Sequence, residues 1–132
     1  MEHYDPEKPV DPKEWLALDE NKRDYLAEQY HREKRIKMPD SRMHALIHVV
    51  VENQVALGDE IPAQKTLTRL MQEGLSRHDA IHAIGSVVAR HIFDLLKHGP
   101  KDGDTNADYY HQLEQLTAEG WLNSFHEESE ED

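Results

Sequence analysis

The sequence predicts an all-α protein, a compact bundle of about four to five helices. Apolar residues recur at helical spacing in several segments, and capping residues precede these segments while glycine or proline follows them. No segment alternates β-branched and polar residues over the length of a strand, so no sheet is expected. We expect one helical domain over residues 11–120, between a disordered, flexible lead-in at residues 1–10 and a disordered acidic tail at residues 121–132.

The first helix is expected to begin at the sequence Asp11-Pro12-Lys13-Glu14. Asp11 is a favourable N-cap, proline suits the first helical position, and Glu14 can reach back to the cap amide. A charged section at residues 19–22 would allow a kink. The helix must end before Pro39, because the residue that precedes a proline avoids the helical backbone.

Three further helices are expected before residue 100. Residues 40–57 predict a capped helix that is the most hydrophobic segment of the chain. A shorter helix is expected from Pro62 to Gly74, since proline opens helices and glycine closes them. Ser76 can then cap a longer helix with a continuous apolar stripe, which runs to about His98.

The last helix is expected from Ala107 to Glu119, after a loop rich in glycine and aspartate. Gly120 is expected to end it. The acidic tail contains the run EESEED, which has too little apolar surface to fold on its own.

The composition narrows the classes of partner. The chain carries 27 acidic against 15 basic residues, a net charge of −12, so binding to nucleic acid or to an anionic membrane is not expected. There is no apolar run of the roughly 20 residues that span a bilayer and no signal-like N-terminus, so we expect a cytoplasmic protein. The absence of cysteine excludes disulfides and thiolate ligands. Nitrogen and oxygen ligands must therefore hold any metal ion.

Two segments carry histidines four residues apart. His44, His48 and Glu52 follow one another within the second expected helix, and His78 and His82 do so within the fourth. Residues four apart are displaced by only about 40° around a helix, so each set forms a row on one side. Small residues beside the second row would let a neighbouring helix approach closely.

If the two helices pack together, the five residues can form a metal site. Imidazole and carboxylate are ligands for divalent zinc, iron, nickel or manganese. Because a zinc ion usually takes four ligands, some of the five residues would hydrogen-bond to the ligands instead of contacting the metal. With a water molecule at an open position, Glu52 could serve as a base and the site could be hydrolytic. The HxxxH spacing has moderate specificity, and neither segment matches the HExxH motif of metalloproteases.

Other interpretations of the same residues stay open. His44, His48 and Glu52 could form a structural hydrogen-bond network in a non-enzymatic interaction or dimerisation module, such as a homodimer. The clustered histidines could also respond to pH. Beside them, Asn53 and Gln54 are interpreted as ordinary buried amides satisfied by backbone groups rather than as residues that hydrogen-bond to the metal ligands. The sequence identifies no substrate.

The stretches WLALDE, YHRE, MHALIHVVVENQVALGD and RLMQEGLSRHDAIHAIG together resemble a family of small uncharacterised bacterial proteins. The resemblance covers roughly residues 12–98 and is most specific in HALIHVVVENQ and RHDAIHAIG. It implies a bacterial, cytoplasmic, all-helical protein of unknown function. It assigns no catalytic residue.

Overall fold

The computed structural model describes residues 1–33, 41–99 and 105–123. These residues form helices and no strand, which confirms the all-α prediction. The elements are α1 (Pro12–Ala17), α2 (Glu20–Glu33), α3 (Ser41–Ala56), the 3-10 helix η1 (Gly58–Glu60), α4 (Ala63–Gln72), α5 (Arg77–His98) and α6 (Thr105–Gln115), followed by a helical segment at residues 118–123. Most of the expected acidic tail lies outside the described residues.

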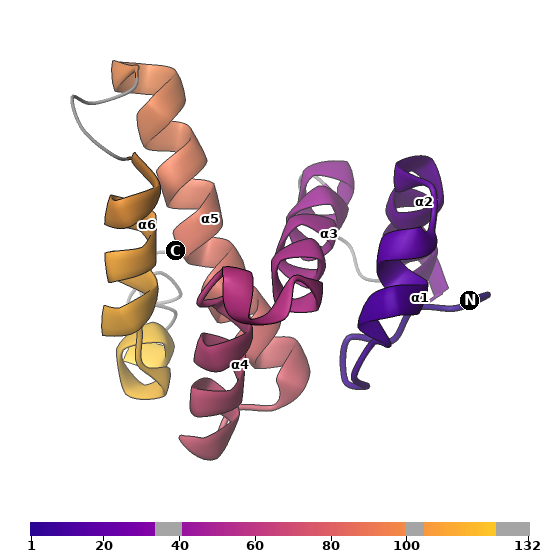
Figure 1. The fold of residues 1–132 in the computed structure, drawn as a ribbon, viewed down its shortest axis with the longest axis horizontal. Helices are drawn as coiled ribbons and strands as arrows, with labels where there is room; N and C mark the ends of the chain where they lie inside the picture. Colours follow the sequence, from indigo (N-terminus) through magenta and orange to yellow (C-terminus); the bar gives the residue numbers. More distant parts are fainter. Residues whose placement is uncertain (34–40, 100–104, 124–132) are drawn as a thin grey trace.

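Helix α3 is the centre of the bundle. It lies between α1 and α2 on one side and α4 and α5 on the other, and α6 packs against the far side of α5 (Figure 1). Val51 belongs to a core shared with α4, α5 and α6, whereas Ala45 and Val49 belong to a second core with Trp15 and Leu26. Two opposite sides of α3 are therefore covered by apolar side chains, and its polar row must lie between them.

The capping residues place most helix starts where the sequence predicts them. The Asp11 side chain accepts hydrogen bonds from the amides of Lys13 and Glu14, and Ser76 Oγ accepts one from the amide of Asp79 at 3.1 Å. Helix α5 ends at Gly99, whose φ of 72° is accessible to glycine with little strain. These local signals are strong because they satisfy backbone groups that a helix end leaves without partners.

Two helices differ from the sequence prediction. The first expected helix is two helices, because Leu18 is extended and the Asp19 side chain accepts a hydrogen bond from the amide of Asn21, which starts α2 afresh. Near the end of the chain, α6 stops at Gln115, and Gly120 does not end it. Thr117 begins the next helical segment, since its Oγ1 accepts from the amide of Gly120 at 3.0 Å.

The N-terminal lead-in contributes to the core. Residues 1–10 contain no helix, yet Tyr4 is only 4% exposed and Pro6 is fully buried. The Tyr4 ring lies 5.7 Å from the ring of Trp15, measured between centroids. The sequence pattern contained no sign of this burial, because a single tyrosine ahead of two prolines has no periodicity. The segment reaches the polar row of α3, as described below.

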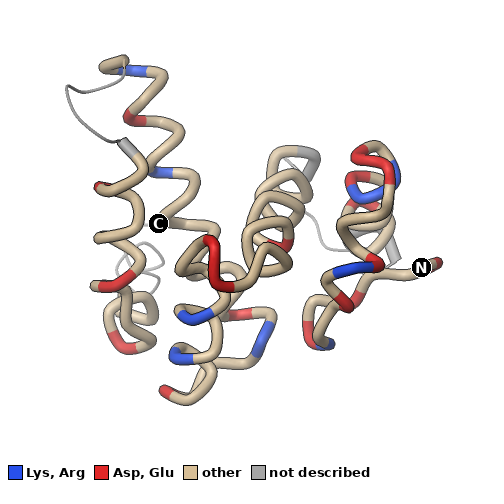
Figure 2. Tube along the Cα trace, in the orientation of Figure 1, with Lys and Arg blue, Asp and Glu red and all other residues tan. Residues whose placement is uncertain are grey.

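Charged residues lie mainly on the outer helices. Figure 2 shows acidic and basic residues along α1 and α2 and basic residues along α4, whereas Glu52 is the single acidic residue in the sequence of α3. Among the described residues, no helix combines the length and the apolar character needed to cross a membrane. A carboxylate in so apolar a helix requires a specific partner.

The close approach of α3 and α5 depends on Gly85. A Cβ atom at this position would lie 2.7 Å from Ile47 Cγ2, which is well inside van der Waals contact. The small residue that the sequence pointed out beside the second histidine row therefore does allow the neighbouring helix to approach. This approach sets the distance between the two rows.

Replacing Gly85 with alanine tests this packing. Alanine favours an isolated helix by about 1 kcal/mol, but the clash with the branched Ile47 side chain is expected to outweigh that gain and destabilise the protein by about 1 kcal/mol net. Urea denaturation would measure the change. The second substitution Ile47→Leu removes the clashing methyl group and should restore part of the stability, and Ser86→Ala is the control at an exposed neighbour. A fully stable Gly85→Ala protein would contradict the proposed contact.

The stability of the fold should also fall at alkaline pH. Burial raises the pKa of Tyr109, whose hydroxyl donates to Gln54 Oε1 at 2.6 Å. The folded chain holds this proton more tightly than the unfolded chain, so the stabilisation is complete below about pH 10 and is lost as the pH rises further. Urea denaturation between pH 8 and 11 should show a smaller loss for Tyr109→Phe than for the wild type. Parallel profiles would contradict this expectation.

Candidate metal centre

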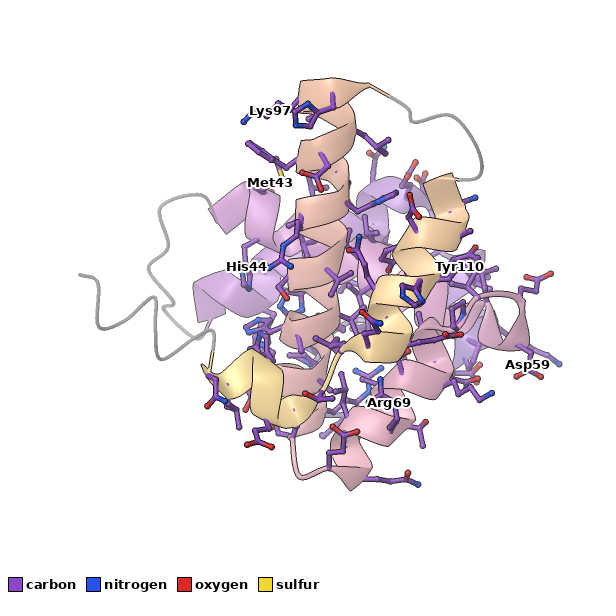
Figure 3. The ribbon with its side chains drawn as sticks, turned by 90° about the vertical axis from the view of Figure 1, so that its left-hand side faces the viewer. Met43, His44, Asp59, Arg69, Lys97 and Tyr110 are labelled. Carbon is purple, nitrogen blue, oxygen red and sulfur yellow. The ribbon has the colours of Figure 1, made fainter. Side chains whose placement is uncertain are left out.

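The histidines of the two rows face each other across the α3–α5 contact. His44 and His48 lie on α3 with ring centroids 4.9 Å apart, and His78 and His82 lie on α5 with centroids 4.3 Å apart. His48 is 1% exposed. Figure 3 shows the side chain of His44 against α5, in agreement with its edge contact to the ring of His82. The packing therefore brings together the two rows that the sequence predicted to meet.

The Nε2 atom of His82 is the meeting point of the cluster. It lies 3.0 Å from Nε2 of His44, 2.9 Å from Nε2 of His48 and 3.1 Å from Nε2 of His78. Ligand atoms of His44, His48 and His82 all lie within 4.8 Å of one another. His78 approaches this group through His82.

Hydrogen bonds alone do not account for this arrangement. An imidazole nitrogen has one bonding direction in the ring plane, so it donates one hydrogen bond when protonated and accepts one when not. Three nitrogens within 3.1 Å of one His82 atom exceed that capacity. A metal ion would take one lone pair from each ring instead. Around a tetrahedral zinc ion with Zn–N distances of about 2.0–2.1 Å, ligand nitrogens lie about 3.3 Å apart. The distances from His82 Nε2 to the other three nitrogens are close to this value.

Glu52, the single carboxylate among the predicted ligands, is not part of this group. Its Oε1 and Oε2 accept two hydrogen bonds from the Arg77 guanidinium, both at 2.8 Å, and its Oε2 accepts a third from the Tyr4 hydroxyl at 2.6 Å. Glu52 is 1% exposed and Arg77 is 5% exposed, so this is a buried ion pair. The carboxylate that the sequence assigned to a metal is neutralised by an arginine.

Tyr4 connects this ion pair to the histidines. Its hydroxyl oxygen lies 3.2 Å from His48 Nδ1. Burial is the largest cause that raises the pKa of Tyr4, followed by the charge and the hydrogen bond of Glu52. The phenol therefore stays protonated and donates a hydrogen bond to the carboxylate. The phenol oxygen then accepts a hydrogen bond from His48 Nδ1. This assignment places the proton of His48 on Nδ1 and leaves a lone pair on Nε2, which lies 2.9 Å from His82 Nε2.

Arg77 also holds the N-terminal segment. Its Nη1 donates to the carbonyl oxygen of Pro6 at 2.9 Å, in addition to the bonds with Glu52. Burial disfavours the charged guanidinium, but the hydrogen bonds and charge of Glu52 outweigh it and raise the pKa of Arg77. One residue further on, the amide of His78 donates to Glu7 Oε1. The start of α5 is therefore tied to residues 6 and 7.

A cavity of about 700 Å³ opens beside the histidine cluster. His44, His48 and His82 form part of its wall, and the other lining residues are mostly apolar or small. These are Met43, Ile47, Asp79, Ile81, Gly85, Ser86, Ala89, Trp121 and Leu122. The three histidines whose ligand atoms lie within 4.8 Å of one another are thus also the ones that a small molecule could reach.

Sequence reasoning missed Tyr4 and Arg77. Tyr4 lies in a segment without periodicity and contacts a residue 48 positions away, so no local pattern predicts its role. Arg77 did leave a signal. It is the first residue of α5, where the helix dipole disfavours a cation, and such a position indicates a carboxylate partner elsewhere.

Asn53 and Gln54 have structural hydrogen bonds as predicted, but both are half-buried and the partners given for them are side chains rather than the expected backbone groups. Asn53 Oδ1 accepts hydrogen bonds from Trp15 Nε1 at 2.8 Å and from Arg23 Nη1 at 3.0 Å, which joins α1 and α2 to α3. Gln54 accepts from Tyr109 of α6. The partners are side chains of other helices, so these amides fix helix packing and stand apart from the histidines.

The comparisons with known proteins assign no family. No family model matches the chain, and neither a curated protein nor a solved structure does so. The resemblance seen in the sequence therefore stays a prediction. The function must be argued from the site itself.

The tautomer of His48 can be tested directly in metal-free protein. Long-range ¹H–¹⁵N NMR spectra should show His48 protonated at Nδ1, and Tyr4→Phe should increase the Nε2-protonated form because the acceptor of the Nδ1 proton is lost. The substitution should also destabilise the protein by roughly 1–3 kcal/mol. Tyr109→Phe, which removes another buried hydroxyl, should leave the His48 signals unchanged. A wild-type His48 protonated at Nε2 would show that the assignment is wrong.

Proposed function

We propose that this chain binds one divalent transition-metal ion through His44, His48 and His82 and uses it in a hydrolytic reaction. The observation that supports the proposal is that ligand nitrogens of these three histidines lie within 4.8 Å of one another, with His82 Nε2 at 3.0 Å from His44 Nε2 and 2.9 Å from His48 Nε2. The hydrogen bond from His48 Nδ1 to Tyr4 also favours the tautomer in which His48 Nε2 can coordinate a metal ion. His78 is not among the proposed ligands. Its Nε2 lies 3.1 Å from His82 Nε2, and it does not line the cavity.

The ligand set favours zinc. Imidazole suits zinc, iron and nickel, whereas manganese prefers carboxylate and water oxygens. Three histidines with a position open to a small molecule are typical of catalytic rather than structural zinc sites. The cavity beside His44, His48 and His82 provides such an open side. Manganese, which the sequence also suggested, fits the histidine cluster least well.

Two acidic residues near the histidines have different proposed roles: Glu52 orients a ligand, and Asp79 takes part in the reaction. When bound, a zinc ion supplies Lewis-acid chemistry, which polarises a carbonyl group or activates water. Glu52 is an unsuitable base, because Arg77 and Tyr4 occupy its oxygens. Asp79 is the acidic residue that lines the cavity, and we propose it as the candidate base. The role of Glu52 is to orient His48 through Tyr4.

Metal titration of untagged, metal-stripped protein tests the proposal. Zn²⁺ should bind in a 1:1 ratio, and at a free concentration of 100 times Kd it should stabilise the folded state by about 2.7 kcal/mol. His82→Gln should lower the affinity by roughly 100-fold or more, since it removes the central nitrogen. The affinity can be measured by competition with a chelator, and the stabilisation by thermal denaturation.

The matched control is His98→Gln, at an exposed position on the same helix, α5. It removes a histidine that lies outside the cluster, so its affinity should equal that of the wild type. His78→Gln should weaken binding less than His82→Gln. A wild-type protein without stoichiometric metal, or equal affinities for His82→Gln and His98→Gln, would contradict the proposed site.

A further inference from the structure

The cavity beside the histidines has the size and the walls of a small-molecule site. Its volume of about 700 Å³ lies within the range of roughly 300–1,000 Å³ that is usual for such sites. Two of its lining residues on α5, Gly85 and Ala89, carry little or no side chain. Gly85 lets α5 pack against Ile47 of α3, and the small side chain of Ala89 leaves space beside the helix.

The walls select for apolar groups. Met43 and Ile47 come from α3, Ile81 from α5, and Trp121 and Leu122 from the helical segment near the end of the described chain. That segment is held in place from outside the cavity, because Glu73 Oε1 accepts a hydrogen bond from the amide of Ala118 at 2.9 Å. Apolar surface from three elements therefore surrounds the same space.

Polar groups in the cavity are few. Ser86 Oγ donates to the carbonyl oxygen of Ala83 at 2.6 Å, so its proton is already used within the helix. Asp79 is exposed. The remaining polar lining groups are the imidazoles of His44, His48 and His82 and the indole N–H of Trp121. A ligand that fits these walls has one polar end directed at the histidines and an otherwise apolar body.

We infer that the cavity binds carboxylic acid derivatives with an aryl or bulky acyl body, whose carbonyl oxygen reaches the metal ion. This inference rests on the proposed metal site and names its substrate class. The body lies against the apolar residues of α3 and residues 121–122, and the oxygen takes the coordination position that faces the cavity. The small side chain of Ala89 leaves room for the ring or branched chain.

Two hydroxamates that differ only in their body provide the probes. Both present the same oxygen donors, but benzohydroxamate carries a phenyl ring where acetohydroxamate carries a methyl group. Added to Co²⁺-loaded protein, each should change the visible absorption of the ion, and benzohydroxamate should bind at least about tenfold more tightly because its ring is buried in the cavity. Equal affinities would overturn the inference.

A matched pair of variants locates the binding. Ala89→Phe fills the cavity from an exposed helical position and should remove the preference for benzohydroxamate. Ala17→Phe makes the same change at an exposed position on α1 and should keep the preference. An unchanged preference in Ala89→Phe would overturn the inference. If Ala89→Phe fails to fold, the wild-type comparison of the two hydroxamates still decides.

The same experiment separates this inference from the metal proposal. If no Co²⁺ absorption develops in wild-type protein, the metal site is wrong and the inference falls with it. If Co²⁺ binds in a 1:1 ratio but both hydroxamates bind alike, the metal proposal stands and only the substrate class is wrong.

Discussion

The buried ion pair of Glu52 and Arg77 is the interaction on which the arrangement of this protein depends. Two charges removed from water require nearly complete compensation, and each is supplied with further partners, the Tyr4 hydroxyl for the carboxylate and the Pro6 carbonyl for the guanidinium. The pair thereby joins α3, the start of α5 and the N-terminal segment at one place. Removing one partner would leave an uncompensated charge, at a cost of about 3–5 kcal/mol.

This ion pair also sets the positions of the histidines. Arg77 meets Glu52 near one end of the α3–α5 contact, and five residues along α5 His82 meets His44 and His48. Three residues beyond His82, Gly85 lets α5 approach Ile47 closely. The rings therefore face one another because the two helices are held in a fixed register. Tyr4 transmits the same constraint to the ring of His48, which it holds from the opposite side to the cluster.

Interactions between residues close in sequence were enough to predict the helices and the two histidine rows. Asp11 and Ser76 are caps that act within three residues, and the four-residue histidine spacing places both rows on single helix faces. The partner of Glu52 was a different problem. Spacing showed that a buried carboxylate needed compensation, but a metal ion and an arginine 25 residues away satisfy that need equally well in sequence. Only the tertiary structure distinguishes them.

Glu52 pairs with Arg77 and not with a metal ion, so its negative charge does not offset the charge of an ion in the proposed centre. Glu52 and Arg77 sum to zero, so a divalent ion held by His44, His48 and His82 would keep nearly its full charge. Such an ion attracts an oxygen donor strongly at its remaining position, and the protein supplies no carboxylate ligand from Glu52 to weaken that attraction. With the proposed metal ion bound, imidazole ligands beside an apolar cavity would combine a strong Lewis acid with a preference for apolar groups. This combination links the position of one buried arginine to the chemistry that the histidines can perform.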